Sequence, residues 1–140
     1  MEITPNIGLG PLRFGMRPEQ VRMLLEEPET YEDWMGGNLN DSLLYHGLVL
    51  GFNTNDTYGP LSNSKFCEAR INGREDVVIW GKSLCDWRRA SVVDYLEQES
   101  LPYQLPASGD VNVTALSLEL SFGDHDELIV VEMWSPRISR

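Results

Sequence analysis

Residues 116–134 read LSLELSFGDHDELIVVEMW, and this stretch indicates how the chain folds. Apolar and polar side chains alternate at its start, a Gly-Asp-His-Asp turn follows, and a second alternating run ends at Trp134. Alternation places every second side chain on one face, so each run is expected to be a half-buried strand. Two strands joined by so short a turn pair antiparallel. The alternating apolar positions are Leu116, Leu118, Leu120 and Phe122 in the first run and Ile129, Val131 and Met133 in the second.

The same pattern recurs earlier in the chain. Residues 42–52 are strand-like, with Gly47 as a turn or bulge. Apolar residues alternate over 67–71, and Asn72-Gly73 then offers the two positive-φ residues of a tight turn. Because 77–80 can supply the return strand, the sequence predicts a hairpin of 67–71 with 77–80.

Two segments have apolar residues at helical spacing. A helix is predicted over 18–27, with proline at its first position, where the missing N–H costs nothing. A second helix is predicted over 84–98, with Ser83 as its N-cap. The apolar faces of strand and helix include Cys67 and Cys85, which we expect to be buried thiols rather than redox or metal sites.

The order of these elements predicts the fold class. A helix followed by antiparallel strands, without a βαβ rhythm, favours an α+β fold in one domain, residues 1–140, with two helices on one face of an antiparallel sheet.

The two halves of the chain also resemble each other, as pseudo-repeats over 7–66 and 77–136. Leu48–Phe52 matches Leu118–Phe122, and Phe14-Gly15-Met16 matches Trp80-Gly81-Lys82. Duplication and convergence of amphipathic pattern both explain this likeness.

Composition limits the class of partner. The 140 residues are 41% hydrophobic and carry 11 Lys and Arg against 22 Asp and Glu, a formal net charge of −11. No apolar run is long enough to span a bilayer, and the N-terminus lacks the pattern of a signal peptide, so we expect a soluble cytoplasmic protein. An excess of acid disfavours nucleic acid and anionic membranes and favours solubility or a basic partner.

The position of the charges says more than their total. Neither 23–64 nor 90–136 contains a Lys or Arg. The acids of these stretches need cations from elsewhere, either Arg88 and Arg89 after folding or the basic side chains of a second protein.

Catalytic chemistry has little support in the sequence. Only His46 and His125 offer imidazole bases, and neither lies in a recognisable triad or metal-ligand spacing. We therefore expect no enzyme, no cofactor and no metal site. An enzyme with an unrecognised site would need a deep pocket that joins one of these histidines to several carboxylates.

An acidic cluster with two aromatic residues is the first candidate partner-binding site. Loops carry function disproportionately, and Tyr and Trp are favoured binding anchors. The alternative is a solvated loop whose tryptophan packs on the core. The cluster consists of Glu26, Glu27, Glu29, Tyr31, Glu32, Asp33 and Trp34. A second acidic patch, Asp124, Asp126 and Glu127, would join the same surface if the halves are related by pseudo-symmetry.

Residues 8–21, GLGPLRFGMRPEQV, resemble the opening of small bacterial toxin-immunity proteins, including those that guard contact-dependent growth inhibition toxins. The repeated helix-plus-sheet plan also resembles β-lactamase inhibitor proteins and small outer-membrane assembly lipoproteins. The resemblance implies an immunity protein that binds and neutralises a cognate toxin, such as a basic nuclease, through an acidic surface. A non-inhibitory protein-binding adaptor or assembly domain is the alternative.

Overall fold

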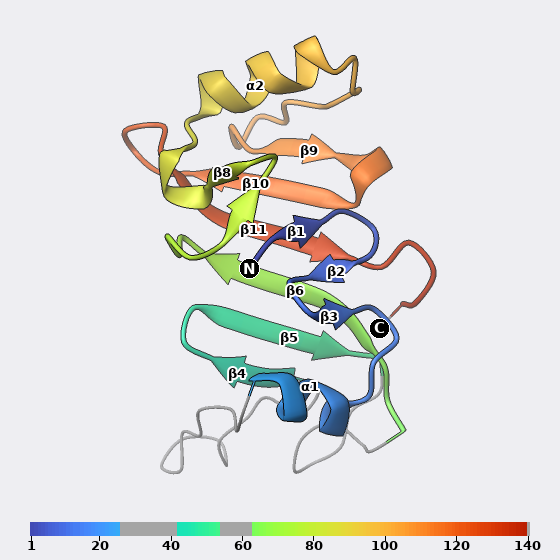
Figure 1. Ribbon diagram of the computed structural model, residues 1–140. Coiled ribbons are helices and arrows are strands. Elements are labelled where there is room, and N and C mark those ends of the chain that lie inside the picture. Colours follow the sequence, from blue (N-terminus) through green and yellow to red (C-terminus); the bar gives the residue numbers. More distant parts are fainter. Residues whose placement is uncertain (26–41, 54–62, 140) are drawn as a thin grey trace.

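A six-stranded antiparallel sheet forms the centre of the computed structural model, which describes residues 1–25, 42–53 and 63–139 (Figure 1). Its strand order is β4-β5-β6-β11-β10-β9. The antiparallel α+β fold expected from the alternating runs is therefore confirmed. The strands are β4 (Ser42–Tyr45), β5 (Leu48–Phe52), β6 (Phe66–Asn72), β9 (Val111–Val113), β10 (Leu118–Phe122) and β11 (Leu128–Trp134).

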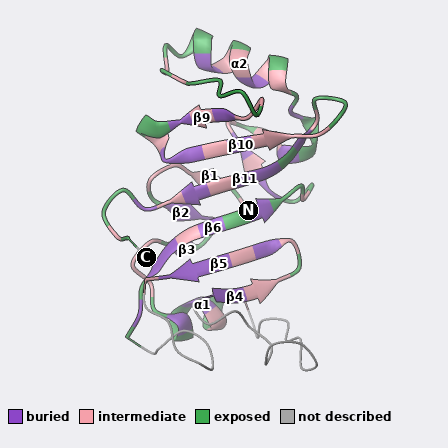
Figure 2. Ribbon diagram, turned by 180° about the vertical axis from the view of Figure 1, so that it is seen from behind, coloured by how far each residue is buried: buried purple, intermediate pink, exposed green. Residues whose placement is uncertain are grey.

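One face of this sheet is covered. A small three-stranded sheet lies in front of it in Figure 1, and the helices α1 and α2 lie beside the β4 and β9 edges. Figure 2 shows the opposite face, on which no helix or strand of the described residues lies. The covering elements are β1 (Ile3–Thr4), β2 (Gly8–Leu9), β3 (Leu12–Arg13), α1 (Pro18–Leu25), β7 (Val78–Ile79), β8 (Lys82–Ser83) and α2 (Arg89–Gln98), with short 3-10 turns η1 (Leu84–Asp86) and η2 (Thr114–Leu116).

Alternation along the strands decides which side chains enter the core. Two cross-strand rows on the covered face are apolar and almost wholly buried, and both helices add buried residues to the same core cluster. Burial of side chains of this size contributes roughly 1.5–3 kcal/mol each. The rows are Leu43, Leu50, Ala69, Met133, Leu118 and Val113, and Tyr45, Leu48, Ile71, Val131, Leu120 and Val111.

The two half-sheets, β4–β6 and β9–β11, are arranged symmetrically about the β6–β11 pair. Each half places a bulge at the second residue of its last strand, Cys67 in β6 and Ile129 in β11. The bulges lie opposite equivalent phenylalanines, Phe52 and Phe122. The predicted match of 48–52 with 118–122 therefore joins equivalent strands, and a common origin of the halves remains a hypothesis.

The other predicted match does not join equivalent positions. Phe14-Gly15-Met16 follows the β2–β3 hairpin, and the carbonyl of Met16 accepts from the N–H of Phe66. Trp80-Gly81 instead forms the turn between β7 and β8. In the second half the segment that leads into the helix and touches the start of the last strand is Trp87-Arg88.

The hairpin predicted at Asn72-Gly73 is wrong. β6 pairs on one side with β5 and on the other with β11, so no edge remains for 77–80. The positive-φ pair lies instead at Trp80 (φ 51°) and Gly81 (φ 81°), where β7 turns into β8. Pairing of both edges of β6 and burial of its apolar row outweigh the local turn preference of Asn-Gly.

The helix predicted over 84–98 is broken near its start. Ser83 caps only the η1 turn, accepting from the N–H of Cys85 at 3.3 Å. The chain then extends through Trp87 before α2 begins at Arg89, which resets the helical phase. Cys67 is buried as predicted, whereas Cys85 is exposed, and the burial predicted for it is wrong.

Candidate protein-binding face

The two predicted acidic sites have different outcomes. The cluster from Glu26 to Trp34 lies outside the described residues. The second patch, at 124–127, forms the turn between β10 and β11.

This turn is held by cations of the chain itself. The guanidinium of Arg89 donates to the carboxylate of Asp126 and, at 3.0 Å, to the carbonyl of Gly109. Arg88 donates to the carbonyl of His125 at 2.9 Å. The alternative in which Arg88 and Arg89 supply the missing cations therefore holds at Asp126, whose carboxylate is already paired.

Glu127 and the backbone of Asp126 also help to order the turn. Glu127 accepts from the backbone N–H of His125 at 3.0 Å, which fixes the turn locally. Asp126 itself has a positive φ of 61°, a conformation that Asp tolerates better than most residues. We conclude that Asp126 and Glu127 order the turn, and that a partner would have to compete with those bonds.

The histidines do not meet each other or a carboxylate cluster. The carbonyl of His46 accepts from Arg74, whose guanidinium also pairs with Asp76 and holds the pKa of that carboxyl below its usual range. Within residues 1–25, 42–53 and 63–139, no three His, Cys, Asp or Glu side chains are grouped so as to hold a metal ion. None of the described helices is long and apolar enough to cross a membrane.

The side of the six-stranded sheet on which none of the described helices or strands lies, here called the open face, carries the more informative charge pattern. Its side chains come from alternate positions of all six strands, and two of them, Ser42 and Val130, are buried. The others are Leu44, Val49, Glu68, Arg70, Asn72, Asn112, Glu119, Ser121, Glu132 and Trp134.

An ion pair marks the centre of the open face. Arg70 and Glu132 are cross-strand neighbours on β6 and β11, joined at 3.0 Å, with 55% and 43% of their side chains exposed. Both occupy the fifth position of their strands, so this pair lies on the pseudo-twofold axis of the sheet. An exposed pair of this kind contributes little stability, roughly 0–1 kcal/mol.

Acid predominates on the β10 side of that pair. Glu119 lies directly opposite Glu132, and like charges at such positions repel. Burial, the negative charges of Glu132 and Asp110, and a hydrogen bond with Asp110 together raise the pKa of Glu119. The carboxylates are thus only partly neutralised by Arg70, and a further cation placed here would be stabilised.

An aromatic side chain adjoins this acidic row. Trp134 is half-buried on β11 and lies opposite Glu68 on β6, while Val49 lies opposite Arg70. Tryptophan is among the residues most enriched in protein-binding hot spots, so Trp134 is the candidate anchor on this face.

The alternating pattern predicts strands for Glu119, Glu132 and Trp134, whereas the predicted partner contacts lie in loops. Alternation also predicts that these side chains point away from the apolar face, but which face of the sheet is covered depends on where the N-terminal strands pack. Comparison of the chain with protein-family models, with curated proteins and with solved structures found no match.

Proposed function

We propose that this protein is an immunity protein that docks a basic toxin on the open face of its sheet and acts in the cytoplasm. The observation that carries the proposal is the opposition of Glu119 and Glu132 on the open face, where none of the described helices or strands lies, beside a half-buried tryptophan. A partner that brings Lys or Arg to this face relieves the repulsion between carboxylates and gains charge-assisted hydrogen bonds.

In this proposal the apolar area of the interface contributes mainly to affinity, and the net charge contributes mainly to the rate of association. Trp134 supplies apolar area at the centre of an interface that we expect to bury about 1,600 Å² in total. The net charge of −11 steers a basic partner, so association should approach roughly 10⁸ M⁻¹s⁻¹ at low salt and slow steeply as salt is added. If the partner is a nuclease, carboxylates occupy the positions that substrate phosphates would take.

The test is a rescue assay in cells that express the product of the gene immediately upstream, combined with binding measurements on the purified pair. Glu119→Lys is expected to abolish rescue and weaken binding at least tenfold, since it replaces attraction by repulsion. Glu75→Lys makes the same change at an exposed loop residue away from the open face and should leave rescue intact.

Two outcomes separate the alternatives. Tight binding without protection would identify a non-inhibitory adaptor or assembly domain. Full protection by Glu119→Lys, together with its loss in a Glu29→Lys, Glu32→Lys, Asp33→Lys triple variant, would move the binding site to the first acidic cluster.

A further inference from the structure

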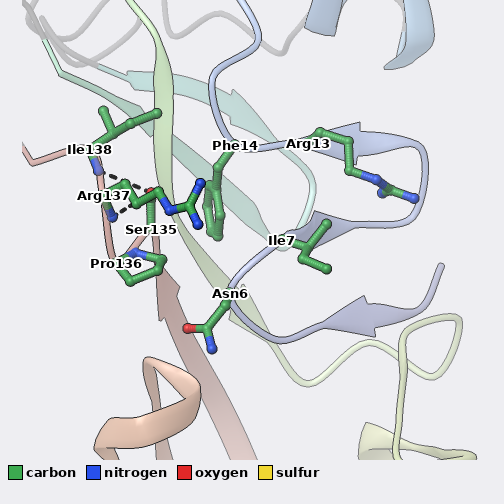
Figure 3. Close-up of a pocket in the computed structure, with 8 residues that line it drawn as sticks. All are labelled: Asn6, Ile7, Arg13, Phe14, Ser135, Pro136, Arg137 and Ile138. Atoms are coloured by element: carbon green, nitrogen blue, oxygen red, sulfur yellow. Dashed lines mark hydrogen bonds between the residues drawn. The ribbon is translucent and has the colours of Figure 1, made fainter.

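A pocket of about 640 Å³ lies where the N-terminal strands meet the segment that follows β11 (Figure 3). One wall is formed by Ile7 and Phe14 and the other by Pro136 and Ile138. Its volume is within the range of sites that bind small molecules or single side chains of a ligand. None of the residues that line this pocket belongs to the open face.

The walls of this pocket are held in place by hydrogen bonds and ring packing. The ring of Phe14 lies 5.0 Å from that of Phe66. Ser135 donates its N–H to the carbonyl of Cys67 at 2.8 Å, and its Oγ accepts from the N–H groups of Arg137 and Ile138 at 3.1 Å. A site with walls fixed in this way loses little entropy when a ligand enters.

Asn6 is among the residues that line the pocket, but the oxygen of its side chain is not accessible to a ligand. Its Nδ2 donates to the carbonyl of Ala115 at 3.1 Å, while its Oδ1 is buried with no hydrogen-bond partner in the described part of the chain. Asn6 therefore ties this wall of the pocket to Ala115 and leaves the binding of a ligand to other groups.

A cation stands at the same pocket. The guanidinium of Arg137 lies on the Phe14 side in Figure 3 and has no carboxylate within ion-pair distance among the described residues. Arg13 is different, because its guanidinium is turned away and donates to the carbonyls of Gly10 and Leu12. Arg137 alone is therefore placed to meet an anionic group of a ligand.

We propose that this pocket binds the C-terminal residue of a peptide chain whose last side chain is apolar. That residue carries both complementary groups close together. Its side chain packs against the apolar walls that include Phe14 and Pro136, and its carboxylate accepts from the guanidinium of Arg137. An uncharged apolar ligand would leave Arg137 unpaired, and an inorganic anion would leave the apolar walls uncovered.

The test is an NMR titration of the full ¹⁵N-labelled chain with the tripeptide acetyl-Ala-Ala-Leu, as the free acid and as the carboxamide. The acid is expected to shift the amide signals of Ile7, Phe14 and Ile138 and to bind about tenfold more tightly than the carboxamide, the usual difference for one charge-assisted bond. Arg137→Gln should remove that preference, so that both peptides bind like the carboxamide does to the unaltered chain.

One further variant is the matched control. Arg17→Gln changes an exposed arginine outside the pocket and should keep the tenfold preference. Absence of shifts at these amides, equal binding of acid and carboxamide, or a preference that survives Arg137→Gln would each overturn the proposal.

Discussion

The half-sheet β4–β6 and the half-sheet β9–β11 share one backbone plan but differ on their outward sides. Toward the core, equivalent positions are alike, as Leu50 and Leu120 show, and each last strand carries its bulge at the same place. On the open face, Val49 of the first half corresponds to Glu119 of the second. Packing fixes the covered side of both halves, whereas the open side is free to differ, and there an apolar residue of one half has an acidic counterpart in the other.

The largest expected effect on stability comes from truncating equivalent core residues of the two halves. Leu50→Ala and Leu120→Ala each remove a fully buried side chain, and each should lower the free energy of unfolding by about 2–5 kcal/mol. Urea unfolding of both variants measures the effect. If one substitution costs less than half as much as the other, the two halves do not share the core equally.

The positions of the tight turns allow a sharper test. The sequence predicts a positive-φ turn at Gly73, whereas the structure has one at Gly81. Gly81 has a φ of 81° and open space around its Cα, so Gly81→Ala should cost about 1–2 kcal/mol through backbone strain alone. Gly73 is outside the positive-φ set, and a Cβ there would lie 3.6 Å from the carbonyl of Leu128, an ordinary contact.

Gly73→Ala is therefore the matched control, expected to leave stability unchanged or to raise it by about 0.5 kcal/mol. Thermal unfolding of the two variants compares them directly. A larger loss of stability in Gly73→Ala than in Gly81→Ala would support the hairpin predicted at Asn72-Gly73.

These turns show why part of the fold was predictable and part was not. The strands 42–52, 118–122 and 128–134 follow from alternation, which is a local signal of a half-buried strand. The partners of β6 do not, because they depend on burial between segments far apart in the chain. No local pattern in the sequence, including Asn72-Gly73, indicates that both edges of β6 pair with other strands.

The candidate sites divide in the same way. Alternation predicts that Glu119 and Glu132 are outward neighbours, but the exposure of that side depends on the packing of the N-terminal strands. The pairing of Asp126 with Arg89 joins residues 37 positions apart, and no spacing rule in the sequence selects it over a partner protein.

Two ion pairs provide a test with a smaller expected effect on stability. One orders the 123–127 turn and the other lies on the open face. Arg89 of α2, which pairs with Asp126 in the 123–127 turn, also bonds to Gly109 and lies 5.1 Å from the ring of Phe122, so Arg89→Ala should cost about 1 kcal/mol. Arg70→Ala on the open face loses an exposed pair and should cost less than about 0.5 kcal/mol.

Double-mutant cycles of Arg89 with Asp126 and of Arg70 with Glu132, at low and high salt, separate the pair energies from the other contacts. Both coupling energies should stay below about 1 kcal/mol because the carboxylates are substantially exposed. A stronger coupling at Arg70 than at Arg89 would make the open-face pair the structural one.

The smallest expected effect concerns Glu119, whose counterpart in the other half is the uncharged Val49. The pKa of Glu119 is raised above its ordinary value of 4.5, so the folded state holds a proton that the unfolded state releases first as pH rises. Stability therefore falls as pH rises through the window above 4.5. Glu119→Gln removes this loss, and at pH 7 it should be more stable than the unaltered chain by a few tenths of a kcal/mol, with solvent screening the charges.

At pH 3 the carboxyl is protonated in both states, so urea unfolding should find the Gln variant and the unaltered chain equally stable. Glu119→Val, which copies Val49 of the other half, should show the same pH-dependent gain. A variant that is less stable at pH 7 would mean that a cation of the chain already holds this carboxylate. If instead the gain in stability accompanies weaker binding of the basic partner that we propose, the repulsion at Glu119 is the free energy that such a partner relieves on docking.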